Sequence, residues 1–274
     1  MQIKLAQNYG FCFGVKRAIK IAEESPNSTT IGPLIHNNEE INRLKNLFNV
    51  DTIHDYSKAK NIKKAIIRTH GITKDNLKDL KNNNIDIVDA TCPFVSKPQK
   101  ICEQMSAKGY QIIIFGDIKH PEVQGVMSYS KNGATIILDK EELKNTAFQS
   151  KVAVISQTTR KFSEFLDIVN FIIPKCKETR VFNTICNATF ENQEAIRVLS
   201  LECDVMIIIG GKNSSNTKQL YAISKSNCFD SYLIENEQEL EKKWFENKNI
   251  CGISAGASTP DWIIQKVMRK IKEL

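Results

Sequence analysis

Three cysteines of this chain occur in similar local sequences. Cys12, Cys92 and Cys186 each follow a stretch typical of a β-strand and precede a stretch typical of an α-helix. The carboxyl ends of parallel strands are where α/β proteins place ligands and reactive groups. Three thiolates from three such loops could bind one iron–sulfur cluster, and they are one short of the usual four ligands. The remaining iron would then be open to a substrate, as a reactive metal site requires.

Spacing alone leaves a simpler interpretation open for these cysteines. Cysteine is among the most frequently buried residue types and often only packs, and no C-x-x-C pair supports a metal site here. The other five cysteines fit simple packing or have no evident role: Cys102, Cys176, Cys203, Cys228 and Cys251.

Several loops after predicted strands are rich in glycine, serine and other polar residues. Such a loop before a helix offers backbone N–H groups and a positive dipole end to an anion. Helix capping uses the same residue types, so each loop has two interpretations. The loops span residues 32–37, 68–71, 116–122, 210–216 and 254–260.

Three of the four histidines, His36, His70 and His120, lie in these polar loops. Histidine can donate to phosphate and titrates near neutrality, although a loop histidine can also be purely structural. Glu122 follows His120 by two residues. A carboxyl group near a buried anion could have a raised pKa and donate a proton. The alternative is an ordinary first-turn helix residue after Pro121.

The composition is that of a globular protein, with 41% hydrophobic and 25% charged residues among 274. No stretch is long enough to cross a membrane, and the N-terminus lacks the plan of a signal peptide. We therefore expect a cytoplasmic location, where cysteines are more often thiols or ligands than disulfides. The net charge of +7 favours anionic ligands and acidic partners. The sequence contains no run of basic residues interleaved with aromatic residues, so we do not expect nucleic-acid binding.

Short apolar runs alternate with helical patterns along the whole chain. This alternation predicts an α/β fold with mostly parallel sheets. The predicted strands include 3–6, 65–68, 85–88, 111–115, 135–138, 152–155, 205–209 and 250–253. The predicted helices include 15–24, 39–48, 74–82, 95–108, 161–173, 192–201, 216–226 and one that begins near Pro260.

The spacing of the three cysteines suggests repeated units of about 90 residues, near the lower end of ordinary domain size. The same plan of helix, strand, polar loop and helix follows each cysteine. We expect three similar small α/β domains, with residues 13–95 in the first, 96–183 in the second, and 1–12 with 184–274 in the third.

A set of motifs in this chain resembles the 4-hydroxy-3-methylbut-2-enyl diphosphate reductase family. The resemblance runs in order from Tyr9 to the final helix. The motifs are GFCFGV, GPLIHN, THG, VDATCPFV, HPEV, SQTT, TICNAT, GGKNSSNT and SAGAS. This family carries out the last step of the methylerythritol phosphate route to isoprenoids. The resemblance implies three α/β domains arranged around a central iron–sulfur cavity.

The resemblance also implies roles for individual residues. One oxygen-sensitive 4Fe–4S cluster per chain would be bound by Cys12, Cys92 and Cys186. Its fourth iron would bind the substrate hydroxyl. Thr158 matches the threonine near that hydroxyl, and Glu122 matches the proton donor. The diphosphate group would be bound by His36, His70, His120, Ser214, Ser215, Asn216 and Ser258.

The implied reaction is a reductive loss of hydroxide from an allylic alcohol, with isopentenyl and dimethylallyl diphosphate as products. A Lewis-acidic iron would weaken the C–O bond, and a proton would let the oxygen leave as water. Electrons entering one at a time suit ferredoxin or flavodoxin as donor. Two other functions remain open from the residues alone. One is a non-redox module that binds a phosphorylated molecule, and the other is an iron–sulfur dehydratase that needs no reductant.

Overall fold

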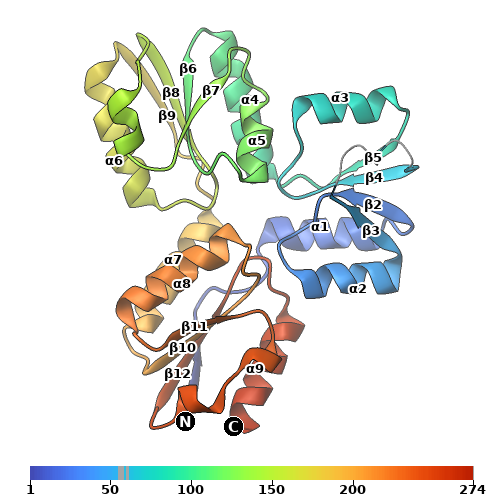
Figure 1. The fold of residues 1–274 in the computed structure, drawn as a ribbon, viewed down its shortest axis with the longest axis vertical. Helices are drawn as coiled ribbons and strands as arrows, with labels where there is room; N and C mark the ends of the chain where they lie inside the picture. The colour runs from blue at the N-terminus through green and yellow to red at the C-terminus, as the bar shows by residue number, and fades with distance from the viewer. Residues whose placement is uncertain (55–58, 60–61, 274) are drawn as a thin grey trace. The chain divides into compact units, whose positions relative to one another are not determined.

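The computed structural model describes residues 1–54, 59 and 62–273, and within it the chain forms two compact units (Figure 1). Unit 1 comprises Met1–Lys16, Ile35–Arg43 and Asn187–Leu274. Unit 2 comprises Arg17–Leu34 and Leu44–Cys186. The chain therefore enters and leaves each unit more than once, and segments distant in sequence build the same sheet.

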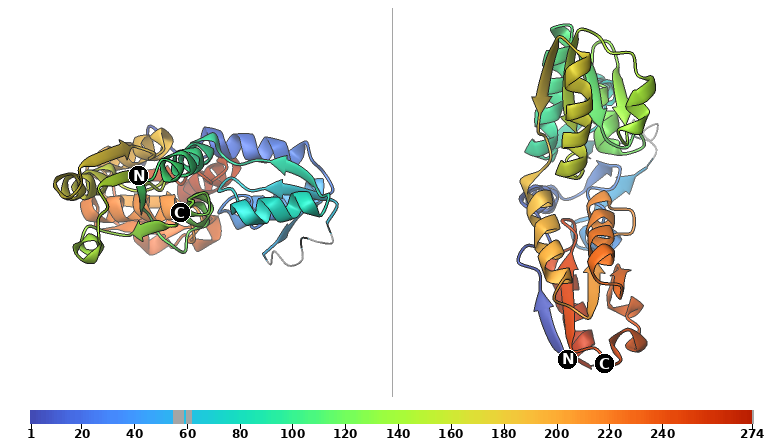
Figure 2. Two further views of the ribbon diagram at one scale, coloured as in Figure 1. Left: turned by 90° about the horizontal axis from the view of Figure 1, so that it is seen from above. Right: turned by 90° about the vertical axis from the view of Figure 1, so that its left-hand side faces the viewer.

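Unit 1 contains a parallel sheet of four strands in the order β1-β12-β10-β11. The strands are β1 (Gln2–Leu5), β10 (Val205–Ile209), β11 (Ser231–Ile234) and β12 (Ile250–Ala255). Its helices are α7 (Asn187–Ser200), α8 (Ser215–Asn227) and α9 (Asp261–Glu273), with short turns η4 (Glu237–Glu239) and η5 (Lys242–Phe245). The N-terminus and the end of α9 lie at the same end of this unit (Figure 2).

The central position of β10 in the sheet explains why the sequence of this strand is apolar without interruption. Ile207 and Ile209 pack with Ile263 and Val267 of α9. Ile208, between them, belongs to a second cluster that includes residues of α7 and α8. Alternate side chains of a strand point to opposite faces, so a sheet covered by helices on both faces requires apolar residues at every position.

Unit 2 contains two parallel sheets of four strands. The first has the order β3-β2-β4-β5, with β2 (Ser28–Ile31), β3 (Val50–Ile53), β4 (Lys64–Ile67) and β5 (Asp86–Asp89). The second has the order β7-β6-β8-β9, with β6 (Gln111–Phe115), β7 (Ala134–Ile137), β8 (Lys151–Ser156) and β9 (Glu178–Phe182). The remaining elements of unit 2 are α3 (Lys74–Asn82), α4 (Pro93–Ala107), α5 (Pro121–Met127), α6 (Phe162–Ile172), η2 (Glu141–Asn145) and η3 (Ile173–Lys175). Helices α1 (Phe13–Glu23) and α2 (Asn38–Phe48) each have residues in both units.

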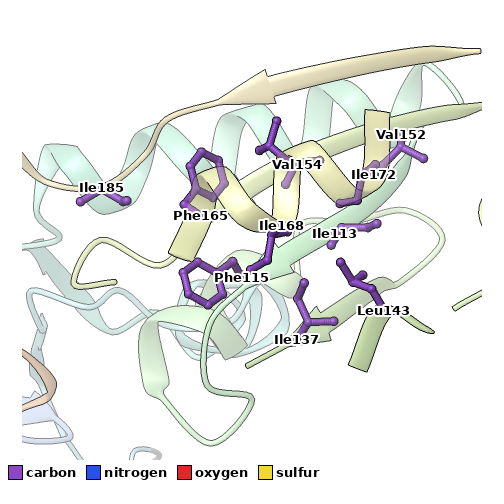
Figure 3. Close-up of a cluster of buried hydrophobic side chains, with 11 residues drawn as sticks. Ile113, Phe115, Ile137, Leu143, Val152, Val154, Phe165, Ile168, Ile172 and Ile185 are labelled. Carbon is purple, nitrogen blue, oxygen red and sulfur yellow. The ribbon is translucent and has the colours of Figure 1, made fainter. Parts of the chain in front are cut away.

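The second sheet of unit 2 is packed on both faces. Phe165, Ile168 and Ile172 of α6 meet Phe115 and Val154 on one face (Figure 3). On the other face, residues of α4 and α5 pack against alternate residues of β6 and β8. This double cover holds the carboxyl ends of β6 and β8 in fixed positions, which matters because polar loops follow both strands.

The same strand order recurs in all three sheets. In each sheet, one central strand is followed in sequence by a strand that pairs with one of its edges. The strand after that pairs with the opposite edge of the same central strand. The strand order therefore reverses between β2 and β4, between β6 and β8, and between β10 and β12. Ligands of open α/β sheets bind at the carboxyl ends of strands at such a reversal. Four of the five polar loops singled out in the sequence begin directly after β2, β4, β6 or β10, and the fifth, 254–260, begins at the end of β12.

The predicted α/β fold with parallel sheets is confirmed, and every predicted strand and helix overlaps an observed one. The sequence interpretation did not include β2, β3, β9, β11 and the short helix α5. Strands β3, β9 and β11 lie at sheet edges, and β2, although central, reads Ser-Thr-Thr-Ile, so these strands lack the unbroken apolar runs of the other central strands. The domain boundaries stay a prediction. No helix among the described residues is long and apolar enough to span a membrane.

Candidate active site

The Cys92 loop connects the outer strand β5 to α4 in unit 2. The Cys92 N–H donates to Thr69 O over 3.0 Å, and Cys92 O accepts from Ser96 N over 3.0 Å. Cys92 is thus the N-cap residue of α4, with extended backbone angles. Arg17 supports the segment before it by donating to Thr91 O over 3.2 Å. The thiol is therefore held at the positive end of a helix dipole.

Cys186 follows the outer strand β9 of the second sheet in the same way. Its N–H donates to Thr158 O over 2.9 Å. The preceding residue, Ile185, is buried in the core on the α6 face of the sheet (Figure 3). An apolar anchor on one side and a backbone hydrogen bond on the other fix Cys186 beside the loop that carries Thr158.

Cys12 is held within unit 1, where it follows β1 and precedes α1. The Cys12 N–H donates to Ala257 O over 3.1 Å, and Cys12 O accepts from Lys16 N over 2.9 Å. Cys12 therefore also stands at a helix N-terminus, next to the loop that contains Ser258. The expected strand-to-helix context holds for all three cysteines.

The other cysteines differ from these three in their electrostatic surroundings. Burial raises the pKa of Cys102 and of Cys251 to about 12. It raises the pKa of Cys203 to about 11, and desolvation also raises the pKa of Cys176 and Cys228. These thiols stay protonated near neutral pH, whereas metals bind thiolates. Cys12, Cys92 and Cys186 are half-buried and stand at helix starts, and none of the eight cysteines forms a disulfide.

Glu122 and Thr158 form a buried pair at the strand-order reversal of the second sheet. The Thr158 N–H and its hydroxyl each donate to one oxygen of the Glu122 carboxyl group, both over 2.7 Å. Glu122 is only 2% exposed and Thr158 is 7% exposed. The pair joins the first turn of α5 to the loop after β8, so the acid is positioned by two different elements.

Burial raises the pKa of Glu122 from 4.5 to about 7, although the hydrogen bonds from Thr158 act in the opposite direction. Desolvation disfavours the charged carboxylate, and it outweighs hydrogen bonds that stabilise that form. Glu122 is therefore about half protonated at neutral pH. A carboxyl group with such a pKa can act as a general acid.

Two of the predicted histidines meet in unit 2. The rings of His70 and His120 are edge to face, with centroids 5.4 Å apart. Nδ1 of His120 accepts a hydrogen bond from the Glu122 N–H over 3.2 Å. A neutral imidazole that accepts at Nδ1 carries its proton on Nε2. His120 therefore presents an N–H donor, which suits an anionic ligand.

The loop that carries His70 is fixed by close backbone contacts. Both the N–H and the hydroxyl of Thr69 donate to Leu34 O, over 3.3 and 2.9 Å. Gly71 has φ of +70°. This left-handed backbone conformation favours glycine, and the nearest atom to a Cβ there would be the movable side-chain end of Gln99. Unit 2 thus links Cys92, His70, His120, Glu122, Thr158 and Cys186 through consecutive contacts.

In unit 1 the glycine- and serine-rich loop after β10 leads into α8. Ser214 is the N-cap, and its hydroxyl accepts from Thr217 N over 3.3 Å. Asn216 is 5% exposed, and neither polar atom of its amide has a hydrogen-bond partner among the described residues. Buried polar groups are rarely left unpaired. The unpaired amide at a helix start therefore indicates a place for a ligand with acceptor and donor atoms.

His36 and Ser258 also meet in unit 1. The Ser258 hydroxyl donates to His36 O over 3.2 Å. A Cβ atom on Gly211 would lie 2.4 Å from the same carbonyl oxygen, so only glycine allows this approach. Unit 1 thus brings together Cys12, His36, Ser258 and the loop that carries Ser214, Ser215 and Asn216.

A supporting network around Glu40 was not foreseen from the sequence. The buried Glu40 carboxylate accepts from Arg43 over 2.7 Å and from the indole N–H of Trp262 over 3.0 Å. Asn37 accepts from Glu40 N over 3.0 Å and so caps α2. The network anchors the residues next to His36 to α9. An asparagine three residues before a glutamate was the only sequence signal available.

Arg160 is a second residue that the sequence interpretation passed over. Its guanidinium lies 5.2 Å from the ring centroid of Phe115, and burial lowers its pKa. Its Nε has no hydrogen-bond partner among the described residues. It follows Thr158 by two residues and adds positive charge to this part of unit 2.

The family of the chain is decided by comparison with known proteins. The sequence model described as LytB protein matches residues 3–272. The chain belongs to the LytB family. The match extends over nearly the whole chain, so both units and all three sheets fall within it.

Named relatives of this LytB chain carry one enzyme name. A protein of Campylobacter fetus subsp. fetus named 4-hydroxy-3-methylbut-2-enyl diphosphate reductase is 65% identical over 100% of this chain and 98% of its own length. A protein of Campylobacter curvus with the same name is 64% identical over 100% of both chains. These relatives therefore resemble this chain from end to end.

Two solved structures resemble this LytB chain. One is described as (E)-4-hydroxy-3-methyl-but-2-enyl diphosphate reductase, the terminal enzyme of the non-mevalonate pathway. It is 42% identical with a TM-score of 0.72, and the match covers 100% of both chains. The other is a reductase of Plasmodium falciparum, described as E-1-hydroxy-2-methyl-but-2-enyl-4-diphosphate reductase. It is 26% identical with a TM-score of 0.90, and the match covers 100% of this chain and 87% of that one.

Proposed function

We propose that this chain is a reductase that removes the hydroxyl group of (E)-4-hydroxy-3-methylbut-2-enyl diphosphate and releases isopentenyl and dimethylallyl diphosphate. Relatives with this enzyme name are 64–65% identical over the full chain. The observation in the structure that carries the proposal is the buried Glu122–Thr158 pair, with the Glu122 pKa raised to about 7. Loss of hydroxide requires a proton, and this pair can supply one.

Cys12, Cys92 and Cys186 are the proposed ligands of one 4Fe–4S cluster, which would lie in the central cavity that the family implies. The donor chemistry supports this choice, because these are the half-buried thiols at helix starts while burial keeps the other thiols protonated. When bound, the cluster supplies a Lewis-acidic iron for the substrate oxygen and a path for electrons.

The diphosphate group is the proposed ligand of the polar loops in both units. His70 and His120 would donate from unit 2, and His120 carries its proton on the nitrogen that is not bonded to Glu122 N. The unit 1 donors would be His36, Ser214, Ser215, Asn216 and Ser258. Many donors are needed because a buried multiple charge without partners is very costly. The unpaired amide of Asn216 supports this part of the proposal.

Glu122 is the proposed proton source, and Thr158 is the proposed relay. The Thr158 hydroxyl lies 2.7 Å from the Glu122 carboxyl group. It can accept the Glu122 proton while it passes its own proton to the leaving oxygen. The complete reaction consumes two electrons and two protons, breaks one C–O bond, forms one C–H bond and releases water. Glu122 accounts for the proton that leaves with the oxygen.

The electrons would come from a carrier of the ferredoxin or flavodoxin class, because the cluster accepts one electron at a time. We place the reaction in the cytoplasm, where a reducing environment protects cluster thiolates. The eight cysteines, none of which forms a disulfide, agree with such a compartment.

An anaerobic assay tests the proposed function. Purified protein loaded with iron and sulfide is mixed with the diphosphate alcohol and dithionite-reduced methyl viologen. We expect consumption of reductant and formation of both isoprenoid diphosphates. Product formation without any reductant would instead indicate a dehydratase. Tight diphosphate binding by protein that takes up no iron would indicate a non-redox binding module.

A further inference from the structure

A hollow of about 590 Å³ opens on unit 2 beside α4 and the start of α1. It is separate from the histidines and the Glu122–Thr158 pair, none of which lines it. Its wall includes Thr91 and Pro93, the residues on either side of Cys92. A molecule seated in the hollow would therefore lie against the backbone that carries one proposed cluster ligand.

The backbone of this wall is rigidly held. Arg17 lines the hollow and donates to Thr91 O over 3.2 Å and to Asp89 O over 3.4 Å. The Thr91 N–H donates to the Asp89 carboxylate over 2.8 Å. A fixed wall would hold a docked carrier in one position beside the loop that carries Cys92.

The hollow has an excess of positive charge. Arg17, Lys97 and Lys100 line it, against the single carboxylate of Asp89. Lys97 and Lys100 are exposed, and neither forms an ion pair with any residue that the structure describes. The only acidic residue of α4, Glu103, instead pairs with Lys74 over 2.6 Å. These two lysines are therefore available to a partner with negative charge.

An exposed aromatic residue borders the charged surface. Phe94 is 41% exposed and lies on the first turn of α4. It is three residues before Lys97, so the two side chains are neighbours on one face of the helix. Apolar contact surrounded by charge is typical of protein interfaces, whereas a small anion would need no aromatic contact.

We propose that this surface, defined by Arg17, Phe94, Lys97 and Lys100, is the docking site for a small acidic protein that delivers single electrons. The proposal rests on the reductase function above, since it names the partner of that reaction. Charge attraction would steer the reduced carrier to the surface. Each encounter would take one electron from one carrier and deliver it to the cluster that Cys12, Cys92 and Cys186 are proposed to hold. Two encounters per turnover would supply the two electrons that reductive removal of the hydroxyl group consumes, together with two protons.

The test compares two reductants on the same cluster-loaded enzyme. One is a reduced acidic [2Fe–2S] ferredoxin, and the other is dithionite-reduced methyl viologen, which needs no docking surface. In Lys97→Glu/Lys100→Glu, we expect kcat/KM for ferredoxin to fall by about 10-fold or more at low salt, within the range of electrostatic steering. Turnover with methyl viologen and the iron content should stay as in the wild type.

The control is Lys78→Glu/Lys81→Glu on α3. These lysines are also exposed and three residues apart, and neither lines the hollow. The control variant should keep its activity with ferredoxin. Raising the salt concentration should reduce the difference between wild type and Lys97→Glu/Lys100→Glu, because salt screens exposed charges.

The outcomes separate this proposal from the proposed function. Unchanged ferredoxin kinetics in Lys97→Glu/Lys100→Glu would overturn the docking site while the wild-type enzyme still turns over with both reductants. An equal loss with both reductants would also overturn it, since the lysines would then support the active site itself. If the wild-type enzyme forms no product with methyl viologen, the reductase function fails, and this proposal fails with it.

Discussion

Glu122 is the residue whose environment is most clearly set for chemistry. Replacing it by glutamine keeps the size and hydrogen-bonding reach but removes the transferable proton. We expect Glu122→Gln to keep its iron and to bind substrate, yet to lose about 10²–10⁴-fold in turnover. Anaerobic steady-state kinetics measure this. Glu103→Gln, at an exposed glutamate of the same unit, is the control. Normal turnover by Glu122→Gln with a full cluster would show that the proton has another source.

The raised pKa of Glu122 also predicts a pH dependence of turnover. The acid form is needed, and it disappears as pH rises through about 7. We therefore expect the turnover number of the wild type to fall on the alkaline side of pH 7. The residual turnover of Glu122→Gln should lack this limb. A wild-type profile that stays flat from pH 6 to 8 would contradict the assignment.

The same pKa has a consequence for stability. The folded pKa of Glu122 is raised from 4.5 to about 7, so the folded state holds the proton more tightly than the unfolded chain. Its stabilising contribution is complete below pH 4.5 and is lost as pH rises to about 7, by roughly 3 kcal/mol. Glu122→Gln has no such loss. Its thermal midpoint should therefore exceed that of the wild type by a margin that grows between pH 5 and 8.

Substitution of Asn216 can distinguish the role of this residue in ligand binding from its role in folding stability. Its buried amide has no hydrogen-bond partner in the described structure, so Asn216→Ala should leave the free energy of unfolding unchanged or higher. Loss of one hydrogen bond should weaken binding of inorganic pyrophosphate by about 10-fold. Titration calorimetry measures this, with Asn227→Ala at the other end of α8 as control. A large loss of stability in Asn216→Ala would show that the amide has a structural partner.

At the scale of a whole helix, the N-cap residue of α8 allows ligand binding and folding stability to be compared in the same way. Ser214 caps α8, and Thr73 caps α3 with the same kind of side-chain hydrogen bond. Ser214→Ala and Thr73→Ala should each lower the free energy of unfolding by about 1 kcal/mol. Only Ser214→Ala should also weaken binding of pyrophosphate, because it alone removes a hydroxyl from the proposed site. Equal pyrophosphate binding by the two variants would show that Ser214 acts only as the N-cap of α8.

Each of the three sheets repeats one element plan. The polar loops follow the two strands between which the order reverses, and the proposed cluster ligand follows the outer strand. Double cover by helices makes the central strands stable and fixes where their carboxyl ends lie. The loops can then carry residues that are poor for stability, such as buried Glu122 and Asn216.

At the scale of the whole molecule, the three proposed cluster ligands come from distant parts of the chain. Cys12 belongs to unit 1, and Cys92 and Cys186 belong to unit 2. Cys12→Ser, Cys92→Ser and Cys186→Ser should each lose most of the iron and sulfide, because two thiolates hold a cluster poorly. Cys102→Ser, at a thiol whose pKa burial raises to about 12, should keep both. Normal iron content in any of the first three variants would remove that cysteine from the ligand set.

The sequence alone was sufficient for the α/β class, for every central strand except β2, and for most helices. Those features depend on local periodicity, and the run Val205–Ile209 is apolar at every position because both of its faces are buried. The motif loops were also recognisable, since they combine glycine, serine or histidine residues near the ends of predicted strands. Edge strands such as β9 were missed because exposed strands carry no such pattern.

Only the tertiary structure decided which environment each of these residues has. The sequence singled out three of the eight cysteines by their strand-to-helix context, and the structure adds that burial raises the thiol pKa of the other five. Glu122 could have been an ordinary first-turn residue until its carboxyl group was found buried against Thr158. A pKa depends on desolvation and on neighbours brought together from distant parts of the chain. Local sequence cannot specify those neighbours, and the fold does.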